Sequence, residues 1–233
     1  RIKESYPDVC WDFLSEEDSK LEGNLFNTKN NWLWVLDPLD GTKDFIQGTG
    51  NYAMHLSLNY KNKPFLGVVL IPERNELWIS FSSKTYCYRN CISEVKLDLK
   101  GNKKLDNLRL ITSKNHNNNF LSNLVEIINF QKIGKMGSIG CKIASILRGE
   151  YDIYISYSNP SGTTPKDWDF AAPAIILKSA GGSITNLDNE ELIYNKDGFK
   201  QGGIIIASNN KIIHKNICLE LKQIISKHNL LPN

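Results

Sequence analysis

The sequence has no long apolar run and no large excess of charge. Its longest apolar stretches, at residues 65–71 and 204–207, are strand-sized, far shorter than the roughly 18 residues that a membrane-spanning helix needs. The 28 Lys and Arg residues nearly balance the 25 Asp and Glu residues, which leaves a net charge of +3. This excess is too weak for the basic footprint of a nucleic-acid-binding protein. We therefore expect neither a membrane nor a nucleic acid polymer as a partner.

The sequence also lacks a metal site made of cysteine and histidine. Cys87 and Cys91 are too far apart for a CxxC motif, and the four histidines are isolated from one another. His55 lies in a strand-like run, which favours a structural role. No apolar segment near the start suggests a signal for export. We expect a cytoplasmic protein with free thiols. The cysteines are Cys10, Cys87, Cys91, Cys141 and Cys218.

The 233 residues, of which 41% are hydrophobic, suffice for one compact unit built from two halves. Strand-like runs with short links fill residues 1–107, which predicts antiparallel neighbours. From residue 108 to residue 233, strands and helices alternate, which indicates an α/β layer structure. The predicted strands are residues 32–36, 53–60, 65–71, 76–81, 85–89, 108–112, 132–136, 151–156, 182–186 and 203–207. The predicted helices are residues 119–128, 139–147, 168–179 and 210–226.

The strongest chemical signal lies where the first of these strands ends. Asp37 and Asp40 are three positions apart there, so their carboxylates point into one space. Neighbouring carboxylates repel each other, and a hard divalent cation is the usual remedy. Gly41 permits a close backbone approach, and Thr42 opens a short helix whose free N–H groups suit a phosphate. The alternative is a solvated turn around Pro38.

Two further acidic segments accompany this motif. Glu16 lies in the run Ser15-Glu16-Glu17-Asp18, which by itself is an ordinary turn or helix start. Asp169 lies in the first turn of an otherwise apolar helix, where capping is the commoner role of an aspartate. A single functional site explains these three acidic segments better than three unrelated occurrences do.

Together these segments resemble the inositol monophosphatase superfamily. The motifs that carry the resemblance are Glu16-Glu17, Asp37-Pro38-Leu39-Asp40-Gly41-Thr42, Trp168-Asp169-Phe170-Ala171-Ala172 and Ala180-Gly181-Gly182. They occur in the order typical of that superfamily and span nearly the whole chain. The resemblance implies an α/β fold of layered αβαβα type and a phosphatase that is a monomer or a homodimer. The superfamily includes inositol monophosphatases, fructose-1,6-bisphosphatases and 3'(2'),5'-bisphosphate nucleotidases.

The resemblance also implies which residues hold metal. Glu16, Asp37 and the main-chain carbonyl of Leu39 match the ligands of one Mg²⁺. Asp37, Asp40 and Asp169 match the ligands of a second. Two or three Mg²⁺ ions are implied in all.

Roles in catalysis and substrate binding follow from the same resemblance. Gly41 and Thr42 donate backbone N–H groups to the phosphate, and the Thr42 hydroxyl orients the attacking water. Glu16, Asp40 and Thr42 are the implied catalytic residues, and Asp169 also belongs to the substrate site. No covalent intermediate is needed, because paired cations activate water and stabilise the leaving oxygen.

The start of the sequence departs from the superfamily pattern. Superfamily members have opening helices with a further aspartate before the Glu-Glu motif, and no residue in 1–15 matches that segment. Asp8 and Asp12 lack its context. The sequence starts at Arg1 rather than at a methionine, so we expect it to begin inside a longer reading frame. Without those helices, we expect exposed apolar residues on the first-half strands and slow hydrolysis.

Lys43, Ser138 and Lys142 bear on the identity of the substrate. Lys43 favours the bisphosphate nucleotidase branch, in which a lysine usually follows Asp-Gly-Thr, although a solvated lysine is the alternative. Ser138 and Lys142 lie in a segment that resembles a second substrate-side loop, although Ser138 also suits a helix N-cap. The turn-rich residues 158–166 suggest a specificity wall.

The resulting prediction is a Mg²⁺-dependent phosphomonoesterase with a small phosphorylated substrate. The branch resemblance favours 3'-phosphoadenosine 5'-phosphate, a by-product of sulfate assimilation, which would be hydrolysed to AMP. An inositol monophosphatase or a fructose-1,6-bisphosphatase-like sugar phosphatase is the alternative enzyme. A catalytically weak protein that binds metal and phosphate is the alternative from another class.

Overall fold

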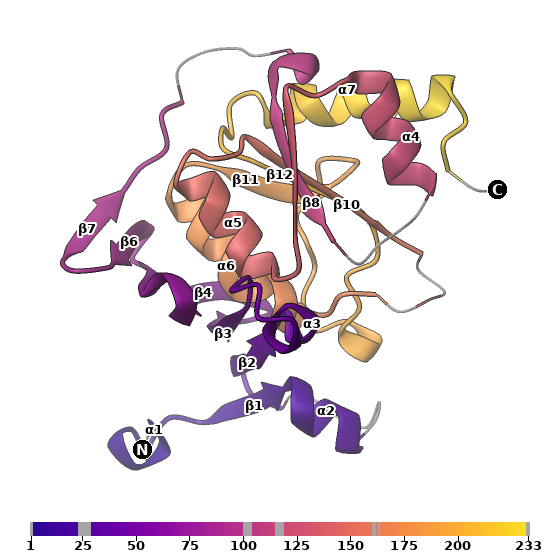
Figure 1. Ribbon diagram of the computed structural model, residues 1–233. Helices are drawn as coiled ribbons and strands as arrows, with labels where there is room; N and C mark the ends of the chain where they lie inside the picture. The colour runs from indigo at the N-terminus through magenta and orange to yellow at the C-terminus, as the bar shows by residue number, and fades with distance from the viewer. Residues whose placement is uncertain are drawn as a thin grey trace.

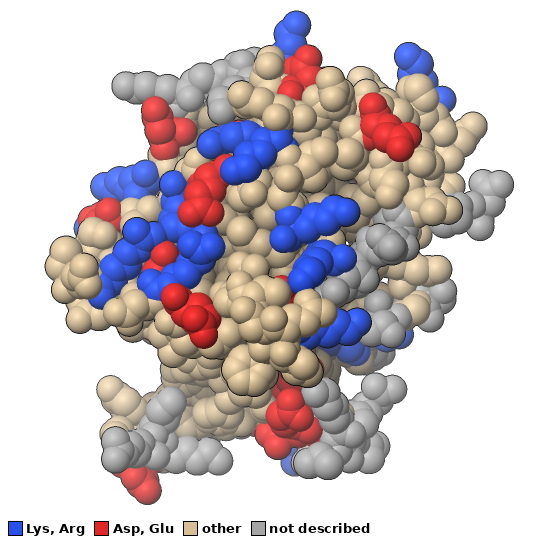
Figure 2. All heavy atoms as spheres, in the orientation of Figure 1, with Lys and Arg blue, Asp and Glu red and all other residues tan. Residues whose placement is uncertain are grey.

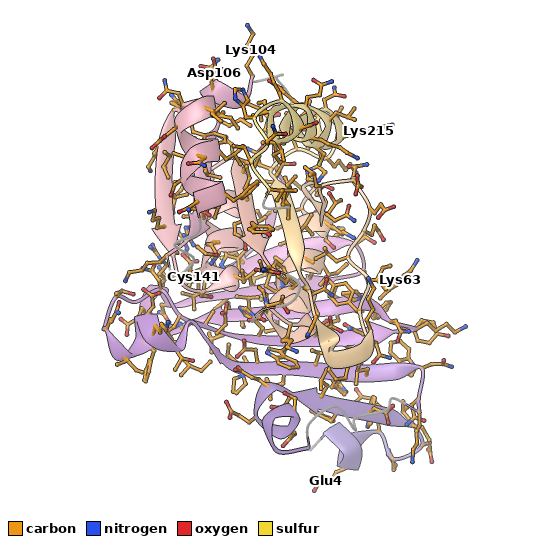
Figure 3. All side chains as sticks on the ribbon, turned by 90° about the vertical axis from the view of Figure 1, so that its right-hand side faces the viewer. Glu4, Lys63, Lys104, Asp106, Cys141 and Lys215 are labelled. Atoms are coloured by element: carbon orange, nitrogen blue, oxygen red, sulfur yellow. The ribbon has the colours of Figure 1, made fainter. Side chains whose placement is uncertain are left out.

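The computed structural model describes residues 2–22, 29–99, 104–114, 119–159, 162 and 164–231. Two β-sheets form its main layers, with helices between them and on the far side of the second sheet (Figure 1). Figure 3 shows these layers from the side, with the first sheet low in the view and Lys104, Asp106 and Lys215 at the opposite end. The described residues thus form the sheet–helix–sheet–helix layers of the predicted αβαβα sandwich.

The first sheet contains seven strands in chain order. β1 pairs with β2 in parallel, and every later neighbour is antiparallel, as the short links predict. The sequence did not predict β1 or β7. The strands are β1 (Trp11–Ser15), β2 (Trp32–Asp40), β3 (Ala53–Tyr60), β4 (Lys63–Ile71), β5 (Glu76–Phe81), β6 (Lys84–Tyr88) and β7 (Ile92–Val95).

One face of the first sheet packs against the central helices, α5 (Ile139–Leu147) and α6 (Asp167–Ser179). Thr85 of β6 donates its hydroxyl proton to the main-chain oxygen of Ile176 at 2.6 Å, which fixes α6 on this face. Cys141, labelled in Figure 3, belongs to the same core between the sheets. The central helices therefore hold the first sheet and the second sheet together.

The opposite face of the first sheet is also apolar and lies partly open. Phe13, Phe81 and Tyr88 are 37%, 51% and 46% exposed there. Two short helices, α1 (Ile2–Ser5) and α2 (Glu16–Glu22), lie beside β1 at the edge of the sheet (Figure 1). Exposed apolar side chains are thus present on the first-half strands, and their union into one large patch stays a prediction.

The second sheet has the strand order β11-β12-β10-β8-β9. A second core joins it to the outer helices, α4 (Asn119–Ile128) and α7 (His214–Lys227). The strands are β8 (Arg109–Ser113), β9 (Lys132–Met136), β10 (Ile153–Ser158), β11 (Ser183–Asn186) and β12 (Gly203–Ser208). No helix in the described part of the chain is long and apolar enough to cross a membrane. All five cysteines are free thiols, as predicted.

The prediction for the last helix was wrong at its start. α7 begins at His214 rather than at residue 210. The side-chain oxygen of Asn210 accepts the main-chain proton of Ile212 at 2.9 Å, which holds residues 210–212 in a turn. A local side-chain bond of this kind competes with the helix.

Candidate active site

The acidic cluster is built from two elements that are far apart in sequence. Asp37 and Asp40 lie at the end of β2, where the pairing with β3 shifts register between them. Asp169 lies in the first turn of α6. One carboxylate oxygen from each of the three lies within 4.8 Å of the others. The structure therefore brings together three of the predicted metal ligands.

The three carboxylates destabilise one another's charged forms. Burial, followed by the charges of Asp40 and Asp169, raises the pKa of Asp37 well above its ordinary range. Burial and then the charge of Asp40 raise the pKa of Asp169 in the same direction. Charges buried together at this distance need a counter-charge. An all-oxygen donor set of this kind fits a hard divalent cation such as Mg²⁺.

Asp169 has a second, structural role. Its Oδ2 accepts the main-chain proton of Lys166 at 2.5 Å, which caps the start of α6. The capping role that the sequence favoured for Asp169 alone is thus present together with its place in the cluster. The cap also fixes the carboxylate, since one oxygen is held by the backbone.

Glu16 reaches the same site from the edge of the first sheet. It is the first residue of α2, directly after β1, and it is half-buried. It lines the pocket, and its charge contributes to the raised pKa of both Asp37 and Asp169. Glu16 lies outside the three-carboxylate cluster but close enough to interact with it.

Leu39 and Thr42 lie on either side of the turn at Gly41, between β2 and α3 (Thr42–Ile46). Asp37 Oδ1 accepts the main-chain proton of Leu39 at 2.9 Å, and Thr42 donates its hydroxyl proton to the Leu39 carbonyl at 3.1 Å. Gly41 has a φ of 87°, and a Cβ on it would lie 2.8 Å from the Asn51 carbonyl oxygen. Only glycine fits such a position. The turn therefore aims Asp37 and Asp40 into one space.

Ser138 holds Asp40 rather than facing the pocket. It is fully buried, and its hydroxyl donates to Asp40 Oδ2 at 2.7 Å. The main-chain N–H groups of Ile139 and Gly140 donate to the same oxygen at 2.5 and 3.3 Å. Ser138 also accepts the main-chain proton of Cys141, which confirms the N-cap alternative. These N–H groups at the start of α5 thus serve a carboxylate of the protein instead of a substrate.

Lys142 lines the pocket, but its ammonium group is already bonded. It donates to Ser113 Oγ at 3.3 Å and to the carbonyls of Met136 and Gly137 at 3.1 and 2.7 Å. An ammonium group has three protons, so these bonds use all of them. Burial lowers the pKa of Lys142 to about 8. Lys142 therefore contributes positive potential and loop geometry rather than a free donor.

The acidic cluster opens into a pocket of about 570 Å³. Lys43, which is exposed, lines one side of it. Thr164, Pro165 and Lys166 line another, so the described end of the turn-rich loop forms part of its wall. Residues 160, 161 and 163 of that loop lie outside the described residues. In the view of Figure 2, basic side chains gather in separate groups on the left and right of centre, with acidic side chains beside them.

Sequence reasoning missed several side chains at the site. Ser113 and Tyr154 line the pocket, yet neither belongs to a recognisable motif. His55 was interpreted as a structural residue, and its burial agrees with this. However, its Nε2 lies 3.3 Å from Asp40 Oδ2. The available signal was the hairpin between β2 and β3, whose register places His55 opposite Asp37.

Comparison with known proteins agrees with the superfamily resemblance that the acidic motifs suggested. The sequence model of the inositol monophosphatase family matches residues 1–226. The chain is 33% identical over 189 residues to the 3'(2'),5'-bisphosphate nucleotidase CysQ of Buchnera aphidicola. That match covers 78% of this chain and 64% of the CysQ protein, so the chain spans less than two thirds of this relative.

Two other similarities cover more of the chain. The Nus factor SuhB of Pseudomonas aeruginosa is 26% identical over 218 residues, which are 90% of this chain and 73% of SuhB. The solved structure of the Thermotoga maritima IMPase superposes with a TM-score of 0.72 at 24% identity and covers 97% of this chain and 79% of that one. The fold, the acidic motifs and the family match agree, and the chain belongs to the inositol monophosphatase family.

Proposed function

We propose that the chain is a Mg²⁺-dependent phosphomonoesterase that hydrolyses 3'-phosphoadenosine 5'-phosphate to AMP. The observation that carries the proposal is the cluster of Asp37, Asp40 and Asp169, whose oxygens lie within 4.8 Å of one another beside an open pocket. Glu16 and the Leu39 carbonyl are the further ligands of this proposal. Bound Mg²⁺ supplies Lewis acidity to phosphoryl oxygens and to water.

The side chains around the cluster have distinct parts in the proposed reaction. The backbone N–H groups of Gly41 and Thr42 bind the phosphate that is removed. The Thr42 hydroxyl, which lies 3.1 Å from the Leu39 carbonyl, orients the attacking water.

The charges of the pocket support a substrate with more than one phosphate. Two divalent cations would balance the four carboxylates of Glu16, Asp37, Asp40 and Asp169. Lys43, Lys142 and Lys166 also line the pocket, and their charge would remain to attract a second anionic group. Because Lys142 has its protons in use, the exposed Lys43 is the better candidate for direct contact. The similarity to the nucleotidase CysQ supports the same substrate class.

A phosphate-release assay over four substrates tests this proposal. The substrates are 3'-phosphoadenosine 5'-phosphate, AMP, inositol 1-phosphate and fructose 1,6-bisphosphate, each with Mg²⁺ and with EDTA. We expect Mg²⁺-dependent release with the highest kcat/KM for the nucleoside bisphosphate. A preference for inositol 1-phosphate or fructose 1,6-bisphosphate would replace the proposed substrate with the alternative one.

A second candidate is a catalytically weak protein that binds metal and phosphate. The similarity to SuhB, a relative named as a Nus factor, favours it. This candidate predicts tight Mg²⁺ binding with negligible phosphate release from every substrate in the assay. The enzyme and the binding protein are thus separated by turnover and not by metal affinity.

A further inference from the structure

The segment of residues 195–201 is clamped to the start of α6. Asp167, in the first turn of α6, accepts the main-chain proton of Asn195 at 2.5 Å and a side-chain proton of Gln201 at 2.7 Å. The main-chain N–H of Gln201 also donates to the Pro165 carbonyl at 2.8 Å. Because Asp167 is only 1% exposed, these buried bonds fix both ends of the segment.

The clamped segment forms part of the wall of the pocket. Gly198 and Phe199 line the pocket, as do Lys166 and Trp168. The φ of Phe199 is 54°, a left-handed conformation that is uncommon for a residue with a bulky side chain. Such backbone strain persists only where the surrounding structure holds it, and it is frequent at ligand sites. The clamp therefore keeps the segment in a conformation that the chain alone would not favour.

The same clamp places two lysines opposite each other. Lys166 and Lys200 face each other in an isolated antiparallel β-bridge. Side chains at opposite positions of an antiparallel pair lie on the same side, and like charges there destabilise the pair. Burial, and next the charge of Lys200, lower the pKa of Lys166, and the charges of Asp167 and Asp169 offset this only in part. The two ammonium groups therefore repel each other in the ligand-free protein.

No acidic side chain forms an ion pair with these two lysines within the described part of the chain. The carboxylate of Asp167, which is next to Lys166 in the sequence, is used by the clamp. The Lys166 ammonium donates to the Gly198 carbonyl at 2.5 Å, which uses one of its three protons. Lys200 is exposed. The pair thus offers positive charge and N–H donors beside the pocket.

We propose that Lys166 and Lys200 bind a second phosphate group of the substrate, the one that is not hydrolysed. An anion between two opposed ammonium groups removes their repulsion and accepts charge-assisted hydrogen bonds from them. Lys43 belongs to α3, so its contribution to the same phosphate is separate. The inference rests on the proposed function, because it assigns one part of the substrate to one wall of the proposed active site.

Two nucleotides that differ only in the second phosphate test this inference. They are 3'-phosphoadenosine 5'-phosphate and adenosine 3'-monophosphate, which carry the same phosphate to be hydrolysed. The bisphosphate preference is the ratio of their kcat/KM values. In Lys200→Gln we expect this preference to fall about 10-fold, the lower end for a charge-assisted hydrogen bond, because Lys200 is exposed. The preference should also weaken as KCl is added.

The stability of the ligand-free protein separates binding from a structural role. Lys200→Gln removes the repulsion with Lys166, so the melting temperature should stay the same or rise. Lys200→Glu places opposite charges in the bridge, so it should raise the melting temperature and abolish the bisphosphate preference. Lys196→Gln is the matched control, because Lys196 is an exposed lysine of the same segment that lies outside the bridge. It should leave the preference unchanged.

The outcomes decide whether the lysine pair binds the second phosphate. Equal losses on both nucleotides in Lys200→Gln would overturn the inference, and so would a lower melting temperature with an unchanged preference. An equal fall of the preference in Lys196→Gln would assign the effect to the general charge of the segment and overturn it as well.

Hydrolysis of neither nucleotide by the unchanged protein would refute the proposed activity, and the comparison would then be made by binding. Both nucleotides would be titrated by calorimetry in the presence of Mg²⁺ into the unchanged protein and into Lys200→Gln. We expect Lys200→Gln to lose affinity for the bisphosphate alone. A ratio of the two affinities that Lys200→Gln leaves unchanged would overturn the inference.

Discussion

Replacing Asp40 by asparagine removes one charge from the acidic cluster and keeps the shape of the side chain. The amide has a single oxygen, so it must choose between two orientations. If the oxygen takes the place of Oδ2, it keeps the protons of Ser138, Ile139 and Gly140. The amide nitrogen then takes the other position, where it cannot bind a cation. The fold is preserved in this orientation, and the metal site is not.

The size of the effect follows from this geometry. Loss of a ligand should exceed the roughly 10- to 100-fold loss of metal affinity that follows the removal of an outer partner. Phosphate release should fall by orders of magnitude, because the reaction depends on the cations. In the metal-free protein, weaker bonds to the start of α5 cost about 1.5–3 kcal/mol. Relief of the repulsion with Asp37 and Asp169 acts in the opposite direction. We expect the two effects largely to cancel.

Calorimetry with Mg²⁺, phosphate release at saturating Mg²⁺ and urea unfolding without metal together check this prediction. Asp167→Asn is the matched control, because Asp167 is another buried aspartate of α6 that accepts protons from Asn195 and Gln201. It should lose stability and keep Mg²⁺ affinity. Near-normal turnover of Asp40→Asn at saturating Mg²⁺ would refute the assignment of Asp40 as a metal ligand.

Three further predictions concern other parts of the structure. In Lys43→Ala, kcat/KM should fall about 10- to 100-fold more for the nucleoside bisphosphate than for the monophosphate, since a charge-assisted contact is lost. In Gly41→Ala, urea unfolding should show a loss of about 1–3 kcal/mol, because φ is 87° and the new Cβ meets the Asn51 carbonyl. Burial lowers the pKa of His214 to about 4 in the folded chain. Between pH 6.5 and 4 the unfolded chain therefore binds more protons than the folded chain does. The contribution of neutral His214 to the free energy of unfolding is therefore complete above pH 6.5 and falls by about 3 kcal/mol as the pH drops to 4. His214→Gln should remove this pH dependence.

Each of these predictions has a result that contradicts it. Equal losses of Lys43→Ala on both nucleotides would reduce Lys43 to a general electrostatic role. Unchanged stability of Gly41→Ala would mean that the turn tolerates a side chain. An identical acid slope in the unchanged protein and in His214→Gln would assign that slope to other groups.

Local sequence signals predicted much of the fold and the acidic cluster. The bounds of β3 and β5 were predicted correctly because apolar residues alternate there between turn residues. The Asp37 and Asp169 motifs were found because each is short and contiguous. By contrast, β1 was missed, because it pairs with β2 in parallel across a long connection. β7 was missed because it is short and mostly exposed.

The interactions around Asp40 could not be predicted in the same way. The sequence suggested that Ser138, at the start of α5, belongs to a second substrate-side loop. Which group accepts the protons of Ser138 and of the neighbouring N–H groups depends on how α5 packs against the end of β2. Ser138 and Asp40 are 98 residues apart in the sequence. The contact of His55 with Asp40 depends on the strand register and on the absence of a side chain at Gly140. Such long-range contacts leave no local pattern in the sequence.

The central claim is that Asp37, Asp40 and Asp169 form a magnesium centre that hydrolyses a phosphate monoester. The most direct test measures phosphate released from 3'-phosphoadenosine 5'-phosphate while Mg²⁺ is titrated into EDTA-treated protein. We expect no release without Mg²⁺ and a rise that saturates at the Mg²⁺ concentration at which calorimetry finds the site filled. Release that is equally fast in EDTA, or that rises at Mg²⁺ concentrations unrelated to binding, would contradict the claim.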